Sequence, residues 1–301
     1  MGLDSFSYHR WFGETNAWEA PVGERWTLDD LLEHVGTLDV EVVSIQTVHL
    51  PDESPATLRH LRRVLSDRGV EAIVAWGHRR GLEDGRSPER LASALAAMRF
   101  AAELGCGVVR VVCGDQHSWL ADPAARRARL ERLRAPLATI ARAAGRLGVT
   151  VAIENHADVR VAELVALVRS IGSERLGICL DVGNAARVGD EPAQAARAAA
   201  DWTVMAHLRD LRLLAESRGR PDGYWPCVPL GAGDLDLDGV LRALAGAGRC
   251  EAWLVEASNM LPGYGEEAFV TSGLAYLRAK RSALGIVPRG RAAEGGAATP
   301  A

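Results

Sequence analysis

The chain has 301 residues, of which 48% are hydrophobic and 25% are charged. These fractions are typical of a globular protein and exclude a disordered, fibrous or disulfide-rich chain. The formal net charge of −4 provides no excess of cationic side chains that would favour a nucleic acid or a membrane as partner. We expect a cytoplasmic protein, because no signal peptide, C-x-x-C pair or run of roughly 18 apolar residues is present.

Short β-branched runs alternate with longer Ala-, Leu- and Arg-rich stretches of helical period along the chain. This alternation predicts eight βα units and therefore a parallel sheet. The predicted strands cover residues 2–8, 40–46, 70–76, 108–113, 149–154, 176–181, 203–207 and 251–256.

Several predicted helices have clear start signals. Thr27 and Asp30 form a capping-box pattern, and Ser87 and Asp122 each precede a proline at the first helical position. Glycines such as Gly148 follow predicted helices directly before the next strand, as expected for left-handed helix ends.

Eight βα units over residues 1–286 match a single (β/α)8 TIM barrel, which typically has about 250 residues plus insertions. The alternative, an open doubly wound α/β sheet, would favour a glycine-rich phosphate-binding turn, and the chain has no such motif. We therefore predict one α/β barrel domain. Residues 287–301 are rich in Gly, Ala and Pro and are expected to form a flexible C-terminal tail.

Four consecutive predicted strands end in a side chain that can bind a metal: Glu154, Asp181, His207 and Glu256. In a barrel, these strand ends converge at the catalytic face. Three carboxylates held close together cannot all stay ionised without a cation. One imidazole with three carboxylates suits manganese, magnesium or cobalt, and zinc is also possible although no thiolate in the set favours it. The sequence predicts one divalent ion here, with manganese as the first choice.

The chain resembles the xylose isomerase-like superfamily of TIM barrels, also known as sugar phosphate isomerases/epimerases, which includes the endonuclease IV type of repair enzyme (AP endonuclease family 2). The motifs that carry the resemblance are GLDSFSYHRWFGE, VAIENH, LDVGN, HLRD, VPLGAGDLD and LVEAS. The resemblance implies a metal held by the four residues above. It also implies that Glu154 and Glu256 flank the substrate as proton acceptor and donor.

Two departures separate the chain from the endonuclease IV type. Those enzymes have a histidine where this chain has Asn184, and another after the position of His207, where this chain has none. Together with the negative net charge of the chain, these differences argue against a role in DNA repair. We expect Asn184 to contact a substrate hydroxyl instead.

The residue types fit proton transfer next to a carbonyl. A divalent metal lowers the cost of an enediolate, and a carboxylate can then move the proton. If Glu154 and Glu256 act from opposite faces the stereocentre inverts, whereas one glutamate acting alone would shift the carbonyl. We therefore predict a divalent-metal-dependent isomerase or epimerase of a keto-sugar, polyol derivative or sugar phosphate.

Two alternatives remain open. A lyase of the same superfamily, a C-glycoside deglycosidase or a keto-inositol-type dehydratase, would share the proton abstraction and then expel a β-substituent. Cleavage of a C-glycoside would imply a small second subunit, whereas the other readings allow a homo-oligomer. The second alternative is not an enzyme but a non-catalytic sugar-binding barrel. The intact Glu154 and Glu256 argue against it.

Other polar and aromatic residues near the strand ends are candidate substrate contacts. His156 lies two residues after Glu154 and is expected on the same side, as an additional catalytic acid or base. We expect His49 and His78 to bind hydroxyl groups.

Trp76 ends a predicted strand and could pack against the apolar face of a sugar ring. Arg209 could bind a phosphate or carboxylate. Residues 211–229 are long for a βα connection and rich in Gly, Pro and Arg, which is typical of a lid that excludes water.

Overall fold

Eight parallel strands close into a barrel in the computed structural model, which describes residues 1–286. Around the ring the strands follow the order β1, β10, β7, β6, β5, β4, β3, β2, and each pairs in parallel with its neighbours. The strands are β1 (Gly2–Asp4), β2 (Val42–Gln46), β3 (Glu71–Trp76), β4 (Val108–Val112), β5 (Thr150–Glu154), β6 (Leu176–Asp181), β7 (Thr203–Leu208) and β10 (Ala252–Val255). The predicted (β/α)8 fold is confirmed, while the predicted tail at 287–301 lies outside the described residues.

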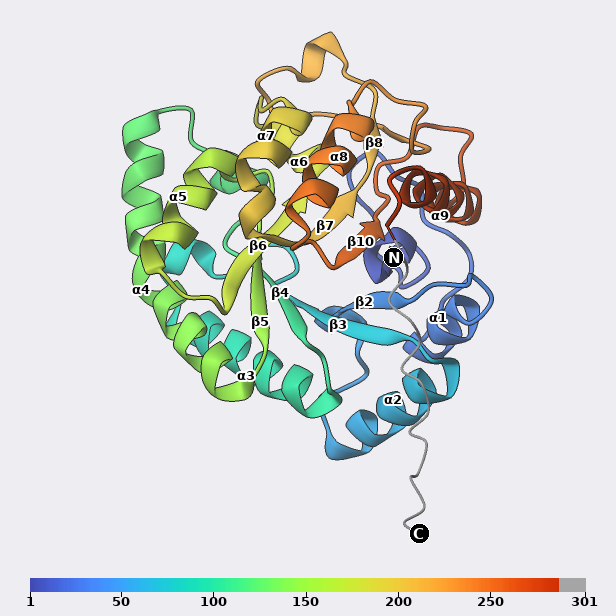
Figure 1. Cartoon of the computed structure of the whole chain (residues 1–301). Coiled ribbons are helices and arrows are strands. Elements are labelled where there is room, and N and C mark those ends of the chain that lie inside the picture. Colours follow the sequence, from blue (N-terminus) through green and yellow to red (C-terminus); the bar gives the residue numbers. More distant parts are fainter. Residues whose placement is uncertain (287–301) are drawn as a thin grey trace.

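Helices surround the barrel strands (Figure 1). They are α1 (Leu28–Val35), α2 (Pro55–Arg68), α3 (Pro88–Leu104), α4 (Pro123–Leu147), α5 (Val161–Ile171), α6 (Val182–Arg187), α7 (Pro192–Ala199), α8 (Leu237–Ala247) and α9 (Glu266–Ala283). The predicted capping box of Thr27 and Asp30 is present at α1, and Ser87 and Asp122 cap α3 and α4. Over residues 1–286, no helix has both the length and the apolarity required to cross a bilayer.

Two local features differ from the prediction. The first strand is shorter than expected because Asp4 accepts a hydrogen bond from the Phe6 amide and starts a 3₁₀ turn over Ser5–Tyr8. Two short antiparallel strands, β8 (Asp210–Leu211) and β9 (Cys227–Val228), were not predicted. β8 and β9 lie near the two ends of the segment 211–229 and pair with each other. This segment between β7 and α8, the β8–β9 excursion, is therefore structured.

Strand alternation explains how the sequence positions the site. The barrel strands form a small apolar cluster of their own, separate from the large core that also includes helix residues. The members of this strand cluster are Val42, Ile73, Ala152, Cys179, Val204, Met205, Ala252 and Leu254, and Val108 packs against it. Residues two apart on a strand share a face. Glu154, Asp181 and His207 each follow a member of this cluster by two positions, as do Arg110 and Glu256. All five side chains are thus directed to the inside of the barrel, above an apolar layer.

Candidate active site

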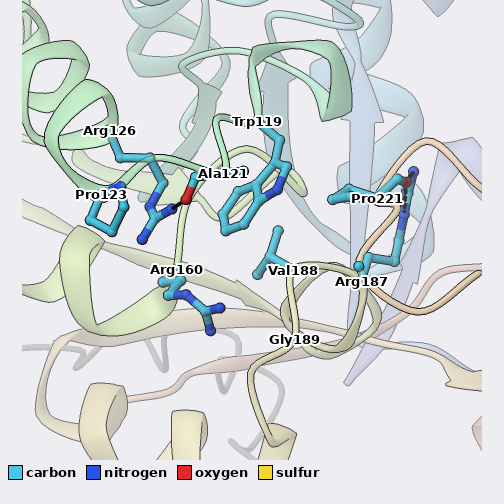
Figure 2. A pocket seen from close by; sticks show the side chains of 10 residues that line it. Trp119, Ala121, Pro123, Arg126, Arg160, Arg187, Val188, Gly189 and Pro221 are labelled. Carbon is cyan, nitrogen blue, oxygen red and sulfur yellow. Dashed lines mark hydrogen bonds between the residues drawn. The ribbon is translucent and has the colours of Figure 1, made fainter.

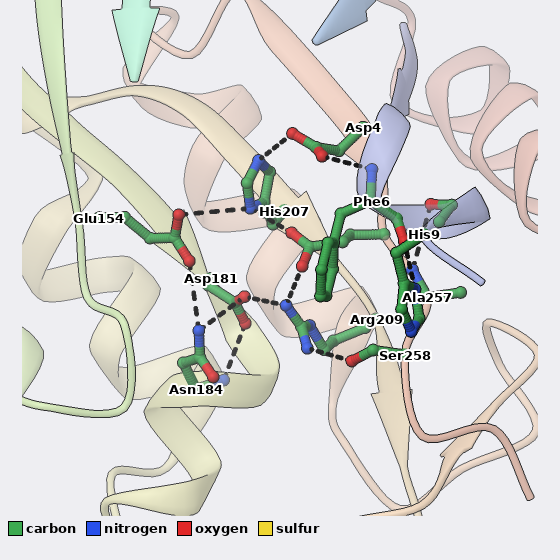
Figure 3. Close-up of polar contacts among 12 residues, drawn as sticks. Asp4, Phe6, His9, Glu154, Asp181, Asn184, His207, Arg209, Ala257 and Ser258 are labelled. Carbon is green, nitrogen blue, oxygen red and sulfur yellow. Dashed lines mark hydrogen bonds and ion pairs between the residues drawn. The ribbon is translucent and has the colours of Figure 1, made fainter. Parts of the chain in front are cut away.

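The four predicted metal ligands converge inside the barrel. Figure 3 shows Glu154, Asp181 and His207 among their polar contacts. Glu154, Asp181, His207 and Glu256 are all buried, with at most 5% of their surface exposed. His207 Nδ1 contacts Glu256 Oε2 and lies 3.8 Å from Glu154 Oε2. One potential ligand atom from each of Asp181, His207 and Glu256 lies within 4.8 Å of the other two. We call these four residues the carboxylate cluster.

Four buried atoms of the carboxylate cluster have no hydrogen-bond partner within the described residues. His207 Nε2 faces Asp4, whereas Glu154 Oε2, His207 Nδ1 and Glu256 Oε2 face one another. Leaving a buried polar group unpaired typically costs about 1–3 kcal/mol, so each such atom calls for a partner. Two carboxylate oxygens and one imidazole nitrogen that face one another are suitable ligands for a divalent metal. The residues present therefore fit such an ion.

Asp181 is fixed by backbone geometry. It ends β6 and caps α6, where Oδ1 accepts a hydrogen bond of 2.8 Å from the Asn184 amide. Asn155 holds the neighbouring backbone, because its side chain donates to Asp181 O at 2.8 Å and accepts from Asp181 N at 2.9 Å. These bonds leave the Asp181 side chain little freedom to turn away from the cluster.

Asp4, which was not predicted, lies behind His207. Its Oδ2 is 3.5 Å from His207 Nε2, and it also accepts hydrogen bonds from Ser44, Gln46 and Phe6. Burial alone would raise the pKa of Asp4, but the hydrogen bond and charge of His207 lower it. An ionised Asp4 orients the imidazole with Nδ1 toward Glu154 and Glu256, as carboxylates behind metal-binding histidines do.

Arg209 lies between two members of the cluster. Its Nη2 donates hydrogen bonds of 2.5 Å to Asp181 Oδ2 and to Glu256 Oε1, and Nη1 donates to Ser258. Burial and the nearby carboxylates raise the pKa of Asp181 to about 6 in spite of Arg209. For Glu256, the charges of Arg209 and His207 outweigh burial and lower the pKa. The guanidinium that we expected to face a substrate anion is thus engaged with the cluster.

Arg110 is a second buried cation that sequence reasoning missed. It projects from β4, with Nε 3.2 Å from Glu154 Oε2 and Nη1 donating to Trp76 O at 3.3 Å. Its position inside the apolar run VVRVV was the signal that could have revealed it, since an unpaired arginine is rarely buried in a strand. With Asp4, the barrel interior holds four carboxylates but only two guanidinium groups, among the residues described.

Asn184 bridges members of the cluster. Its Nδ2 donates to Asp181 Oδ2 at 2.9 Å and to Glu154 Oε1 at 3.3 Å, while its Oδ1 accepts from Arg187. The amide therefore holds two carboxylates in place.

His49 and His78 are brought together by Glu14, another residue that was not predicted. Glu14 lies 2.6 Å from His78 Nε2 and 3.7 Å from His49 Nε2. Phe12 stacks on the His49 ring at a centroid distance of 3.9 Å. The loop after β1 thus joins the ends of β2 and β3, where both histidines were expected.

Two predicted contacts are directed elsewhere. Trp76 is one residue out of phase with the inward-facing positions of β3, so its indole packs outside the barrel and donates to Ser93 on α3. This corrects the expectation that Trp76 meets a sugar ring. His156 lies beyond the end of β5, where strand alternation no longer applies, and its Nδ1 bonds to Gly114 O at 2.9 Å. His156 is thus held by the loop after β4 and makes no described contact with the cluster.

A family model described as the xylose isomerase-like TIM barrel matches residues 31–280. The chain belongs to this family. Among curated proteins, the rhizopine catabolism protein MocC of Rhizobium meliloti is 26% identical over 79% of this chain and 80% of its own length. The uncharacterized protein YihM of Escherichia coli is 30% identical, and the 3-oxo-isoapionate decarboxylase of Pectobacterium atrosepticum is 28% identical. These two matches cover only 29% and 34% of the respective relatives, and 32% of this chain in each case.

Solved structures of the same superfamily have the same fold as this chain. An L-ribulose 3-epimerase superposes with a TM-score of 0.70 at 16% identity, covering 94% of this chain and 95% of the epimerase. A D-psicose 3-epimerase of Clostridium cellulolyticum gives a TM-score of 0.69 at 17% identity, with coverages of 94% and 98%. The IolI protein with a bound zinc atom gives 0.69 at 16% identity, with coverages of 94% and 96%.

Proposed function

We propose that this protein is a divalent-metal-dependent enzyme that isomerises or epimerises a keto-sugar or polyol derivative. The observation that carries the proposal is a set of three buried atoms without a hydrogen-bond partner. Glu154 Oε2, His207 Nδ1 and Glu256 Oε2 face one another inside the barrel. Membership of the xylose isomerase-like family and the structural likeness to sugar epimerases support the choice of substrate class.

We assign the metal to the carboxylate cluster, with manganese as the preferred ion. When bound, a divalent metal supplies Lewis-acid stabilisation of negative charge on the substrate oxygens next to the reacting carbon. A histidine that binds a metal is neutral. With His207 neutral, the four buried carboxylates exceed the two buried guanidinium groups by two charges, which a divalent cation would balance. Because the set contains three carboxylates and one imidazole, it favours a hard ion over zinc.

Glu154 and Glu256 are the proposed proton acceptor and donor. They project from β5 and β10, which are separated by β6 and β7 around the ring. A substrate between them would be approached from two sides, as an epimerase requires. Arg209 and Asn184 hold the two glutamates through hydrogen bonds to Glu256 Oε1 and Glu154 Oε1, which leaves each Oε2 available.

A lyase is the second candidate. One matched relative is named as a decarboxylase of an oxo acid. Loss of carbon dioxide next to a keto group also places negative charge beside a carbonyl, so the same cation and the same cationic side chains would stabilise it. The two reactions differ in what is released.

The proposal is tested by solvent deuterium exchange at the carbon next to the carbonyl, with a panel of ketoses, ketose phosphates and inososes. We expect manganese-dependent exchange that falls by about 10²-fold or more in Glu154→Gln or Glu256→Gln, because general acid–base groups typically contribute 10²–10⁴-fold. Glu33→Gln, which alters an exposed glutamate of α1, serves as control and should exchange like the wild type.

Each outcome has a defined meaning. Exchange without product release supports an isomerase or epimerase, while release of carbon dioxide, water or an aglycone selects the lyase. If the two glutamine variants exchanged as fast as Glu33→Gln, the proposed catalytic role of the cluster would be wrong.

A further inference from the structure

A pocket of about 390 Å³ lies outside the carboxylate cluster, and Figure 2 shows residues that line it. We call it the arginine pocket, and its walls include Trp119, Arg126, Arg160, Arg187, Val188 and Pro221. These residues follow β4, β5, β6 and β7, so they belong to the strand-to-helix face that carries barrel active sites. None of the residues that line the pocket is acidic.

Trp119 organises one wall of the pocket. The guanidinium carbon of Arg126 lies 4.8 Å from the indole centroid, and that of Arg160 lies 5.7 Å from it. Arg126 is paired with Glu163, and Arg160 donates Nη1 to Asp190. In the part of the chain that the structure describes, Nη2 of Arg126 and Nη2 of Arg160 have no hydrogen-bond partner. Two guanidinium groups thus keep donors available around an aromatic face.

Helix ends add positive potential at the same place. Pro123, which lines the pocket, is the first residue of α4, and Arg160 is the N-cap of α5. Both helices have at least eleven residues, and the N-terminus of a helix carries a partial positive charge. The first amides of α4 already donate to the Asp122 carboxylate, and the Val161 amide of α5 donates to Asp190. The available Nη2 groups are therefore the donors that suit the pocket to an anion.

Arg187 links the arginine pocket to the carboxylate cluster. Its Nε donates to Pro221 O at 2.8 Å, and its Nη1 donates to Asn184 Oδ1 at 3.2 Å. Asn184 in turn contacts Asp181 and Glu154. Arg187 and Asn184 therefore connect the pocket to the cluster through side-chain hydrogen bonds, so the two places are neighbours on this face of the barrel.

We propose that the arginine pocket binds the anionic end, a phosphate or carboxylate, of a substrate whose carbonyl end lies at the carboxylate cluster. The position of the carbonyl rests on the proposed function, whereas the binding of an anion does not. The carboxylate cluster repels an anion, and the guanidinium groups of the pocket provide the fork geometry that phosphate and carboxylate groups bind. The volume suits such a group, because small-molecule sites start at about 300 Å³.

Anion binding is measured first, by calorimetric titration of the purified full-length protein with inorganic phosphate and with acetate. We expect Arg160→Gln to weaken binding of the preferred anion at least fivefold. Arg160→Lys, which keeps the charge but lacks the fork geometry, should bind more weakly than the wild type and more tightly than Arg160→Gln. Arg134→Gln is the matched control, because it removes the same charge from an exposed position of α4. It should bind like the wild type. Absence of binding, or equal binding by Arg160→Gln and Arg134→Gln, would overturn the inference.

Substrate preference is measured second, by deuterium exchange with a ketose phosphate, a keto-sugar acid and a neutral ketose of equal carbon number. We expect at least a tenfold preference in kcat/KM for one charged compound over the neutral ketose. Arg160→Gln should reduce this ratio to about one, whereas Arg134→Gln should keep it. The ketose phosphate and the keto-sugar acid are then compared by how far kcat/KM falls in Arg160→Gln. The compound with the larger fall shows whether the pocket binds phosphate or carboxylate. A preference for the neutral ketose in both proteins would contradict the inference. If anion binding depended on Arg160 but the wild type exchanged no proton, the proposed function alone would fail.

Discussion

At the scale of single residues, Arg110 shows how the barrel interior tolerates a dense group of charges. The residue is 3% exposed, and its Nε lies 3.2 Å from Glu154 Oε2. Burial by itself would lower the pKa of Arg110, but Glu154, Asp4 and other nearby acids raise it, so the arginine stays charged. Arg110 is thus the charged neighbour of the buried Glu154 carboxyl group, and a buried charge without a partner is strongly unfavourable.

Replacement of Arg110 by methionine tests this dependence. Removal of one partner of a buried ion pair typically costs about 3–5 kcal/mol, so Arg110→Met should lower the free energy of unfolding by that amount. Urea denaturation at pH 7 measures the change. Arg134→Met, at an exposed position, should stay within about 0.5 kcal/mol. An equal effect of the two substitutions would show that Arg110 does not support the buried carboxylates.

The same scale shows which site residues the sequence could predict. The four members of the carboxylate cluster were found because each ends an apolar strand in a fold whose strand ends meet. Asp4 and Arg110 act through residues more than 40 positions away, and no local pattern indicates such partners. Trp76 was misplaced because adjacent residues of a barrel strand point to opposite sides. A shift of one residue therefore moves a side chain from the inside of the barrel to the outside.

At the scale of elements, the loop after β1 is held by one buried carboxylate. Glu19 Oε2 accepts from His9 Nε2 at 2.6 Å and from the Asn16 amide, and Oε1 accepts from the Asn259 amide at 2.5 Å. Glu19 thus ties the loop after β1 to the loop after β10, beside the mouth of the barrel. No periodicity marks such loops, so the sequence could predict the helices and strands but not this connection.

Glu19 makes the stability of these loops depend on pH. Burial would raise its pKa, but the hydrogen bond and charge of His9 lower it below the unfolded value of about 4.3. Its contribution is therefore complete above pH 4.3 and is lost as pH falls through the lower, folded pKa. Glu19→Gln should be less stable at pH 7 by about 1–3 kcal/mol, and should lose less stability than wild type between pH 6 and pH 3. Urea unfolding at several pH values measures both effects, and parallel profiles would contradict this account.

At the scale of the whole molecule, closure of the barrel completes the site. β1 pairs with β10 through Gly2 opposite Leu254, and this pairing places Asp4 behind His207. The alternation of strands and helices was sufficient to predict the closed fold. The β8–β9 excursion and the arginine pocket depend on contacts between loops, which the pattern does not encode.

Gly2 tests the importance of closure. A Cβ at this position would lie only 1.6 Å from the carbonyl oxygen of Val42, so Gly2→Ala must displace β1 from β2. We expect a loss of about 3 kcal/mol in unfolding free energy, the upper end of the usual cost of overpacking. Gly107→Ala, where a Cβ would meet nothing within 4 Å, is the matched control and should be nearly neutral. Thermal and urea unfolding compare the two variants.

The most direct test of a metal-dependent site is a calorimetric titration of chelator-treated protein with manganese. We predict that the wild type and Glu33→Gln each bind one ion per chain, and that Asp181→Ala and His207→Ala lose this binding. The ion should also stabilise the folded protein, by about 2.7 kcal/mol when its free concentration is 100 times the Kd. Absence of binding to the wild type, or the same stoichiometry and affinity in Asp181→Ala and His207→Ala, would contradict the proposal that these buried residues form a metal centre.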